Sequence, residues 1–320
     1  MPPVPLQPLR PLRPGRVFVT GASGFVGGAV MQELLGRGYT INALAHRRGV
    51  AGADPRITTI QGDLFDDAAL SAGMGDCQAV IHLVGIIMEN RSKGITFERI
   101  HFEGARHVID AAKASGIRRF VHMSALGVRE NAVSGYHQTK WRAEEYLRNS
   151  GLDYTIFRPS IIHGPAGEFM TMEANWARKK AAPFLFMPYF GAGILGTGGA
   201  GKLQPVYVGD VARAFVDALE KPSTIGKTYA LAGPDQITWK QMHQISSQAI
   251  VGKKRLVVPL PVWYARLLTY ITPSFLLPFN RDQVIMSQED NTGDIAPFVA
   301  DFGFTPRPFE QMLREYAAQL

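Results

Sequence analysis

Val17-Phe18-Val19-Thr20-Gly21-Ala22-Ser23-Gly24-Phe25-Val26-Gly27-Gly28 joins a short apolar run to glycines spaced three residues apart. The apolar run suits a buried parallel strand, and apolar residues then recur at helical spacing until the glycines at 36 and 38. The glycines therefore lie in a strand-to-helix turn, where free amide groups and the helix dipole favour a phosphate group. We expect a dinucleotide site here, with an ordinary structural turn as the alternative, and its residues would be Gly21, Ser23, Gly24, Phe25, Val26 and Gly27.

The composition is that of a globular protein in a reducing compartment. The 320 residues, 46% of them hydrophobic, can form one large domain or two. The net charge of +7 comes from dispersed basic residues, so nucleic-acid binding is disfavoured and cofactor phosphates are the simpler explanation. The single cysteine, Cys77, excludes an internal disulfide and a cysteine-based metal site. We expect a cytoplasmic protein with no metal centre, in which Cys77 has a packing role.

Neither the amino-terminal segment nor any later run is expected to cross a membrane. Prolines interrupt residues 1–14, which we interpret as a disordered arm and not as a targeting peptide. No run reaches the ~18 apolar residues of a membrane span. The sequence thus predicts a soluble protein, with peripheral attachment at the inner face of a membrane left open.

A second strand, residues 39–45, ends at the position that selects between nicotinamide cofactors. An acidic residue there would bind a ribose hydroxyl and repel a ribose phosphate. The sequence instead has His46, Arg47 and Arg48, and two guanidinium groups favour a phosphate. We therefore expect NADP(H) in preference to NAD(H), an ordinary basic surface turn being the alternative.

Two further strands are expected to reach the cofactor. After the strand at 57–60, Asp63 could bind the adenine amino group or cap the next turn, with Leu64 beside it. The run at 79–85 reads as a central parallel strand whose carboxyl end lies against the cofactor. Its contacts would come from Leu83, Val84 and Gly85, whereas His82 is expected to be a packed core histidine.

The pattern that carries chemistry is Tyr136-His137-Gln138-Thr139-Lys140, which follows a helix at 102–115 and a strand at 119–124. Tyr136 and Lys140 lie one helical turn apart on the same face. We expect the ammonium group to lower the pKa of the phenol from its ordinary ~10, so that Tyr136 serves as an acid or base. Lys140 could also hold the nicotinamide ribose, and Ser124 could bind the substrate oxygen.

These residues together resemble the extended or atypical short-chain dehydrogenase/reductases, the family of NAD-dependent epimerases and dehydratases. The resemblance rests on the three glycines, Asp63, Ser124, Tyr136 and Lys140, and on the segments 157–160 and 205–212, and it covers about two thirds of the chain. The amino-acid sequence at 136–141 and 156–165 is most similar to that of relatives of the nucleotide-binding accessory subunit of respiratory complex I. That resemblance implies bound NADPH without established turnover, and it places Arg158, Pro159 and Ser160 near cofactor and substrate.

Two features depart from the family pattern. Only eleven residues separate Ser124 from Tyr136, fewer than expected in sugar-nucleotide epimerases, which puts the role of the serine in doubt. A fourth glycine, Gly28, follows the third and is expected to tighten helix packing. The family implies an α/β fold, a Rossmann-type doubly wound parallel sheet with a smaller C-terminal substrate domain.

The domain plan follows the change in pattern along the chain. A strand at 153–158 completes a cofactor domain at 15–164, and 165–320 forms mainly the smaller substrate or partner domain, with 205–220 returning to the first. A helix at 211–219, a strand at 228–231 and a helix at 238–250 capped by Thr238 are expected there. Apolar residues at 169–190 and the glycine-rich run at 191–201 suggest either an apolar pocket with a flap or an ordinary core with a loop.

Charged residues in the second half leave two questions open. A diphosphate substrate could meet Arg178, Lys179, Lys180 and Lys202, although a sugar nucleotide would call for more polar groups. Basic residues at 253–255 precede an aromatic run to 279, which suits a surface on a bilayer or partner subunit, or a helix packed within its own domain. The segment 253–280 is thus a candidate for peripheral membrane or respiratory-complex contact.

Two functions remain open from the sequence. The first is an NADP(H)-dependent oxidoreductase or epimerase that acts on a carbonyl or hydroxyl substrate. An apolar substrate is one possibility. The second is a non-catalytic NADPH-binding subunit or redox sensor in a complex I-like membrane assembly.

Overall fold

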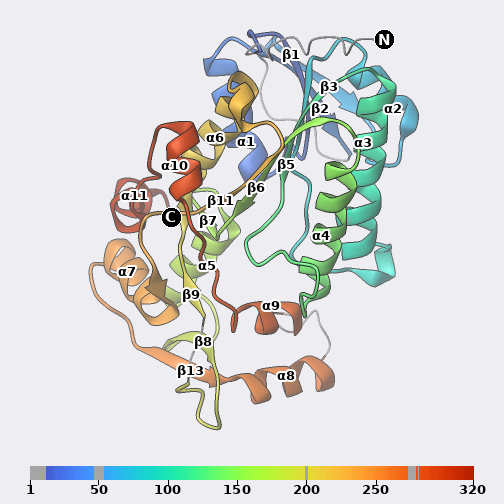
Figure 1. The fold of residues 1–320 in the computed structure, drawn as a ribbon. Coiled ribbons are helices and arrows are strands. Elements are labelled where there is room, and N and C mark those ends of the chain that lie inside the picture. The colour runs from blue at the N-terminus through green and yellow to red at the C-terminus, as the bar shows by residue number, and fades with distance from the viewer. Residues whose placement is uncertain (1–11, 47–53, 199–200, 273–278, 280) are drawn as a thin grey trace.

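A seven-stranded parallel sheet forms the centre of the protein (Figure 1). The computed structural model describes residues 12–46, 54–198, 201–272, 279 and 281–320. The strand order is β11-β6-β5-β4-β1-β2-β3, which is the doubly wound arrangement predicted from the sequence. The strands are β1 (Arg16–Thr20), β2 (Thr40–Ala45), β3 (Ile57–Gln61), β4 (Ala79–His82), β5 (Arg119–Met123), β6 (Asp153–Pro159) and β11 (Lys227–Leu231).

Helices cover both faces of the sheet because its strands alternate side chains between two cores. Val17 and Val19 of β1 point into one core, and Phe18 points into the other. The first core is covered by α1 (Phe25–Gly36), α6 (Val208–Glu220) and α10 (Ala296–Phe302). The second is covered by α2 (Asp67–Met74), α3 (Gly104–Ala114) and α4 (Gly135–Arg148), with Cys77 packed beside them.

The strand order reverses between β1 and β4, and this point positions the site. From β1 the chain runs outward through β2 and β3, then crosses back to β4 and continues through β5 and β6. The loops that leave the carboxyl ends of β1 and β4 therefore diverge to opposite faces of the sheet. In open α/β sheets ligands bind in the crevice formed there.

A second lobe lies beyond the carboxyl ends of the strands (Figure 1). Its core joins α5 (Glu168–Ala177), α7 (Trp239–Val251) and α11 (Phe309–Tyr316). The lower part carries β8 (Met187–Gly191) paired with β13 (Val257–Pro261), followed by α8 (Val262–Ile271) and α9 (Arg281–Met286). The remaining short strands are β7 (Ile162–His163) with β10 (Val206–Tyr207), and β9 (Lys202–Leu203) with β12 (Ile237–Thr238).

The C-terminal half contributes more to the sheet unit than the return at 205–220. Strand β11 pairs with β6 at the sheet edge, and Phe298 and Phe302 of α10 pack against Phe157 of β6. The strand predicted at 228–231 and the helix predicted at 238–250 are confirmed within a residue or two, and Thr238 caps α7 through a capping box. No described helix is long and apolar enough to cross a bilayer. Residues 1–11 of the predicted arm lie outside the described residues.

Candidate active site

The glycine loop between β1 and α1 leaves no room for side chains at two of its positions. Gly21 has φ +76°, which favours glycine, and it lies against the backbone of Leu83 and Val84. A Cβ on Gly27 would lie 2.1 Å from the Gly21 carbonyl oxygen, a distance no real contact allows. A Cβ on Gly28 would meet nothing within 4 Å, so the expected tightening of helix packing at Gly28 is wrong. The close approach belongs to Gly27.

Helix α1 begins at Phe25 with Gly24 as its N-cap, and this end points to the crevice. The Gly24 amide donates to the Gly21 carbonyl oxygen at 3.0 Å, which closes the turn. The first turn of the helix carries no acidic side chain, so no carboxylate of that turn competes for its amide groups and dipole. The arrangement can bind an anionic phosphate.

One cavity of about 1320 Å³ extends from this loop into the C-terminal lobe. Several residues that the sequence predicts for cofactor or substrate line it together, although they come from five separate segments. They are Ser23, Gly24, Phe25, Val26, Gly85, Ser124, Tyr136, Lys140, Pro159 and Ser160. The structure thus brings the glycine loop and the Tyr-Lys pair to one space.

Tyr136 and Lys140 lie in α4, where Ser134 caps the helix by accepting from the His137 amide. The Lys140 Nζ lies 5.6 Å from the Tyr136 ring centre and donates to the Met123 carbonyl oxygen. Burial lowers the pKa of Lys140 to about 8, an effect that the Glu144 carboxylate opposes. Burial raises the pKa of Tyr136, so the predicted lowering of the tyrosine pKa is wrong for the protein without ligands. Tyr136 is here a neutral phenol.

Ser124 is buried at the end of β5, and its hydroxyl donates to the Glu144 carboxylate. Glu144 is fully buried, and it also pairs with Arg148 and Arg158 at 2.6 Å each. Arg158, which the sequence places near the cofactor, thus directs its guanidinium group at Glu144. Since the Ser124 proton points at a carboxylate, its oxygen faces the cavity as a hydrogen-bond acceptor.

His101, which the sequence did not indicate, lies beside the Tyr-Lys pair. It belongs to a π-helical turn, Glu98–Glu103, that precedes α3. Its ring centre lies 5.1 Å from that of Tyr136, and its Nδ1 lies 3.1 Å from Thr139 Oγ1. Burial, and then the Lys140 charge, lower the pKa of His101 to about 2, so the ring is neutral. His101 belongs to no sequence motif, and π-helical turns are rare and frequently occur at functional sites.

The structure also shows where the residues of the central strand β4 and the loop after it lie. His82 is buried as expected, with its Nδ1 2.7 Å from Thr20 Oγ1, and burial lowers its pKa to about 3. Beyond it, the backbone of Leu83 and Val84 packs on Gly21, whereas Gly85 faces the cavity and would place a Cβ 3.4 Å from Lys140 Nζ.

The predicted adenine and ribose-phosphate end lies away from the cavity. His46 Nδ1 lies 3.7 Å from a carboxylate oxygen of Asp63, and both side chains are about half exposed. Asp63 also accepts from the Phe65 amide, so it caps the turn as one of its two predicted roles requires. Leu64 is a buried core residue packed on Gly104. Arg47 and Arg48 lie outside the described residues.

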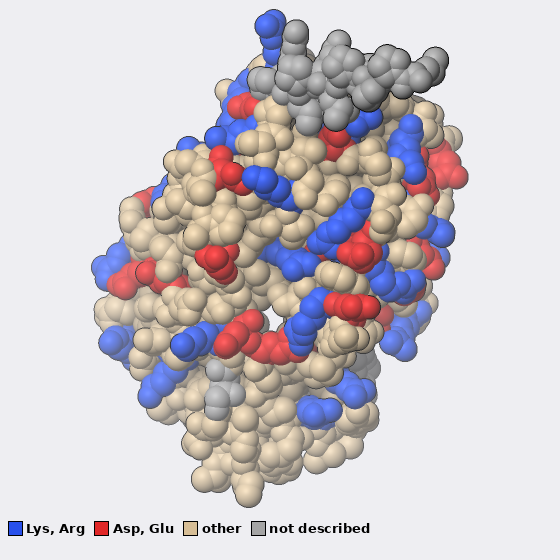
Figure 2. All heavy atoms as spheres, in the orientation of Figure 1, with Lys and Arg blue, Asp and Glu red and all other residues tan. Residues whose placement is uncertain are grey.

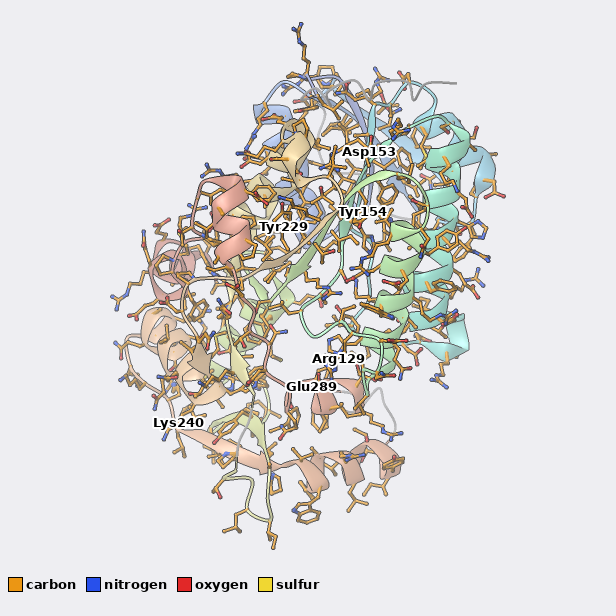
Figure 3. All side chains as sticks on the ribbon, in the orientation of Figure 1. Arg129, Asp153, Tyr154, Tyr229, Lys240 and Glu289 are labelled. Atoms are coloured by element: carbon orange, nitrogen blue, oxygen red, sulfur yellow. The ribbon has the colours of Figure 1, made fainter. Side chains whose placement is uncertain are left out.

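The far wall of the cavity comes from segments that are distant in the sequence. Asn291 accepts from the Ser160 hydroxyl and the Ile161 amide, which ties the end of β6 to the segment after α9. Glu289 and Arg129 form two hydrogen bonds of 2.9 Å, and their side chains point toward each other across the two lobes (Figure 3). Charged side chains surround an opening in this region of the surface (Figure 2). The pair joins the lobes at the cavity mouth.

The basic residues considered for a diphosphate do not line this cavity. Arg178 donates to the carbonyl oxygen of Leu320, and Lys179, Lys180 and Lys202 are exposed. Among the described residues that line the cavity, Lys140 is the single lysine, and none is an arginine. Carboxylates are present instead, on Glu33, Glu168, Glu289 and Asp290.

Comparison with known proteins gives matches in sequence family and in fold. A family described as NAD(P)H-binding matches residues 21–179. The mitochondrial NADH dehydrogenase [ubiquinone] 1 alpha subcomplex subunit 9 of Arabidopsis thaliana is 32% identical over 257 residues, which span 76% of this chain and 60% of that protein. A ceramide reductase of Caulobacter vibrioides is 27% identical over 76% of this chain and 73% of its own length.

Solved structures support the fold. The UDP-glucose 4-epimerase of Thermotoga maritima superposes with a TM-score of 0.72 at 19% identity, covering 95% of this chain and 98% of the epimerase. At this identity the likeness concerns the fold alone. The curated Arabidopsis protein is longer than the part that the chain matches, so its activity and assembly do not transfer to this chain as a whole.

Proposed function

Because the chain belongs to the extended short-chain dehydrogenase/reductase family, we propose that it is an NADP(H)-dependent oxidoreductase that reduces a carbonyl group. The observation that carries this proposal is the shared cavity of the glycine loop with Ser124, Tyr136 and Lys140. NAD(P) binding and an oxidoreductase or epimerase ancestry follow from the family. The direction, the preference for NADP(H) and the roles of the three residues are our proposal.

The residues fit a nicotinamide dinucleotide. The cradle at Gly21 and Gly27 would be filled by any Cβ, and it opens on the start of α1 at the crossover of the sheet. Such a cofactor supplies a hydride when bound. Gly21 to Gly27 would hold its pyrophosphate, and Lys140, whose Nζ lies near Gly85 on the cavity wall, would hold its ribose.

The protonation of Tyr136 supports the direction of carbonyl reduction. A phenol whose pKa is raised by burial keeps its proton at neutral pH but is a weaker acid, so its donation to a substrate oxygen depends on the neighbouring charge of Lys140. Lys140, with a pKa of about 8, carries its charge at neutral pH and stabilises the phenolate left behind. Ser124, whose own proton goes to Glu144, would accept from the hydroxyl group that forms.

Cofactor preference is tested by binding. We expect the Arg47→Ser/Arg48→Ser double variant to bind NADPH about 10- to 100-fold more weakly while NADH affinity changes little, since one lost charge-assisted contact contributes about 1.5–3 kcal/mol. Arg118→Ser, which removes an exposed partner of Asp153, is the matched control. Mass spectrometry of the nucleotide released on denaturation identifies what the purified protein carries. Preferential NADH binding by the unmodified protein would refute the NADP(H) proposal.

Turnover is tested by NADPH oxidation with a panel of carbonyl compounds. We expect Tyr136→Phe to lower kcat at least 100-fold while NADPH affinity stays within about twofold, because the phenol transfers a proton and the ring remains in place. Absence of NADPH oxidation with every carbonyl tested would contradict the proposed activity.

A second function, a non-catalytic NADPH-binding subunit of a membrane-associated respiratory assembly, is favoured by a specific surface. Seven large apolar side chains after β8 and on α8 are 42% to 82% exposed, namely Ile194, Leu195, Trp263, Tyr264, Leu267, Tyr270 and Ile271. The segment 253–281 has five basic and no acidic residues. Such a surface suits peripheral contact with a bilayer or a partner subunit, and the curated relatives include a subunit of NADH dehydrogenase.

Vesicle flotation and co-purification test this second function. We expect the protein to float with phosphatidylglycerol vesicles, and Trp263→Ser/Tyr270→Ser to reduce flotation, whereas Val133→Ser removes an exposed apolar residue of the other lobe and should not. Co-purification with respiratory subunits, together with NADPH that is never oxidised, would favour this function over the first. A protein that neither floats nor co-purifies would contradict it.

A further inference from the structure

The wall of the distal half of the cavity is rich in aromatic and methionine side chains. It carries two tryptophans, two methionines and two phenylalanines, which are Trp176, Trp239, Met172, Met286, Phe190 and Phe279. These residues come from α5, β8, α7, α9 and the segment before α9, so the wall is a convergence of several elements and not one stripe. Aromatic rings and methionines bind alkyl chains through area and dispersion contacts.

The charge of the wall argues against a nucleotide-sugar substrate. A diphosphate is recognised by arginine or lysine groups, and Lys140 is the single lysine, with no arginine, among the described residues of the wall. Glu289 also lines the cavity, and the hydrogen bonds from Arg129 hold the pKa of its carboxyl below the ordinary value, so it is ionised. Asp290 stands next to it. A doubly charged phosphate group would therefore meet carboxylates there.

The volume of the cavity leaves room for an apolar chain beside the cofactor. Pockets for one drug-sized ligand measure about 300–1,000 Å³, and this cavity measures about 1320 Å³. The glycine loop, Gly85 and Lys140 occupy one end, where the nicotinamide half of a cofactor would lie. The other end extends past Phe190 and Leu260 into the β8–β13 pair.

We propose that the distal cavity binds the alkyl chain of an uncharged lipid whose polar end, a carbonyl or hydroxyl group, lies beside Tyr136 and Ser124. This inference rests on the proposed function for the reacting end, but the chain-binding site does not depend on turnover. It names a lipid as the substrate class, in contrast to the nucleotide sugars bound by proteins of similar fold.

The position of the cavity suits a ligand that partitions into membranes. Strands β8 and β13, which line its lower end, lead directly into the exposed apolar loop and α8. Trp263 of α8 donates to the carbonyl oxygen of Ile194, which joins loop and helix into one surface. In Figure 2 this lower end is mostly uncharged, with basic but no acidic side chains visible beside α8.

The test is a binding series on NADPH-loaded protein, read by the fluorescence of Trp176 and Trp239. The probes are octan-2-one, decan-2-one and dodecan-2-one, with UDP-glucose as the polar alternative. We expect the dissociation constant to fall about fourfold for each added methylene group, and UDP-glucose to compete with none of the ketones. Affinity that is independent of chain length, or UDP-glucose binding that displaces dodecan-2-one, would overturn the proposal.

Two cavity variants and one control locate the site. Met286→Lys should place a charge among the alkyl contacts and weaken dodecan-2-one at least about tenfold, and Met172→Trp should shorten the space and flatten the chain-length series. Leu256→Ser, a change at an exposed apolar residue of the same lobe, should alter neither. Unchanged dodecan-2-one binding by both folded cavity variants would place the chain elsewhere and refute the proposal.

NADPH oxidation, measured in parallel, separates this inference from the proposed function. Chain-length-dependent binding without oxidation would support the lipid site and count against carbonyl reduction. Oxidation with short, polar carbonyl compounds and no chain-length effect would support carbonyl reduction and refute the lipid site.

Discussion

The two ends of the cavity are built in different ways. At the glycine loop the wall is backbone, and a single methyl group at Gly27 would overlap the Gly21 carbonyl oxygen. At the C-terminal end the wall is made of side chains from segments as far apart as β8 and α9. Backbone contacts fix the residue type at each position, whereas a side-chain wall fixes mainly its apolar character. The first end is therefore expected to tolerate substitution poorly and the second to tolerate it well.

The largest difference is expected between two alanine substitutions in α1. Gly27→Ala should destabilise the protein by about 3 kcal/mol and weaken NADPH binding at least 100-fold, because backbone atoms cannot make room for the methyl group. Gly36→Ala, an exposed position of the same helix with nothing near its Cβ, should stabilise by up to about 1 kcal/mol. Urea unfolding and NADPH titration measure both. Equal effects of the two variants would remove the basis for the comparison.

The next effect concerns the buried ammonium group of Lys140 and depends on pH. Its pKa falls from 10.5 to about 8 on folding, so between these values the unfolded chain binds more protons and stability rises with pH. Lys140→Met should therefore stabilise by up to about 3 kcal/mol at pH 7, and the gain should shrink as the pH rises from 8 to 10.5. Urea unfolding at several pH values follows this. Lys113→Met, at an exposed lysine, is the control. A gain in stability of Lys140→Met that does not depend on pH would contradict a cost of burying the Lys140 charge.

A smaller effect is expected in the C-terminal lobe at the cap of α7. Thr238→Ala should cost about 1 kcal/mol, because the side chain no longer accepts from the Gln241 amide. Thr171→Ala in α5 removes a hydroxyl that bonds its own helix backbone and should cost less. NADPH affinity should stay unchanged in both. A loss of cofactor binding in Thr238→Ala would mean that the two ends of the cavity are coupled.

The smallest effect is expected at the Arg129–Glu289 pair. Both side chains are partly exposed, so Arg129→Met or Glu289→Gln should change stability by less than about 1 kcal/mol. A double-mutant cycle in urea should give a coupling of about 0.2–1 kcal/mol. A coupling above about 2 kcal/mol would show that the pair holds the two lobes together.

The sheet could be predicted because each strand and helix carries its own periodicity. Val17 to Val19, the run at 79–82 and the capped helix after Thr238 show their burial in the local pattern. The secondary structure of the C-terminal segment could not be predicted in the same way. Residues 259–279 read as one aromatic run, but the structure divides the described part into β13 and α8, because Val257–Pro261 pairs with β8, some seventy residues earlier in the chain.

The Tyr136 and Lys140 pair could be found because one helical turn fixes their separation. Their pKa values could not, since desolvation depends on the whole surroundings and overrides the effect of one neighbouring charge. His101, Glu144 and Asn291 were missed for the same reason. His101 and Asn291 reach the site through packing of segments that carry no local motif. Glu144 lies one turn beyond Lys140 on α4, but only the fold brings it to Ser124 at the end of β5.

The sequence by itself determined the glycine turn, the order of strands and helices, the family resemblance and the single-turn spacing of Tyr136 and Lys140, because all of these are local along the chain. Only the tertiary structure decided that the Ser124 proton points at Glu144, that Arg158 turns to the same carboxylate, and that the distal cavity is apolar with few cations. Those properties arise where distant segments meet, and burial there sets which charges and hydrogen bonds survive.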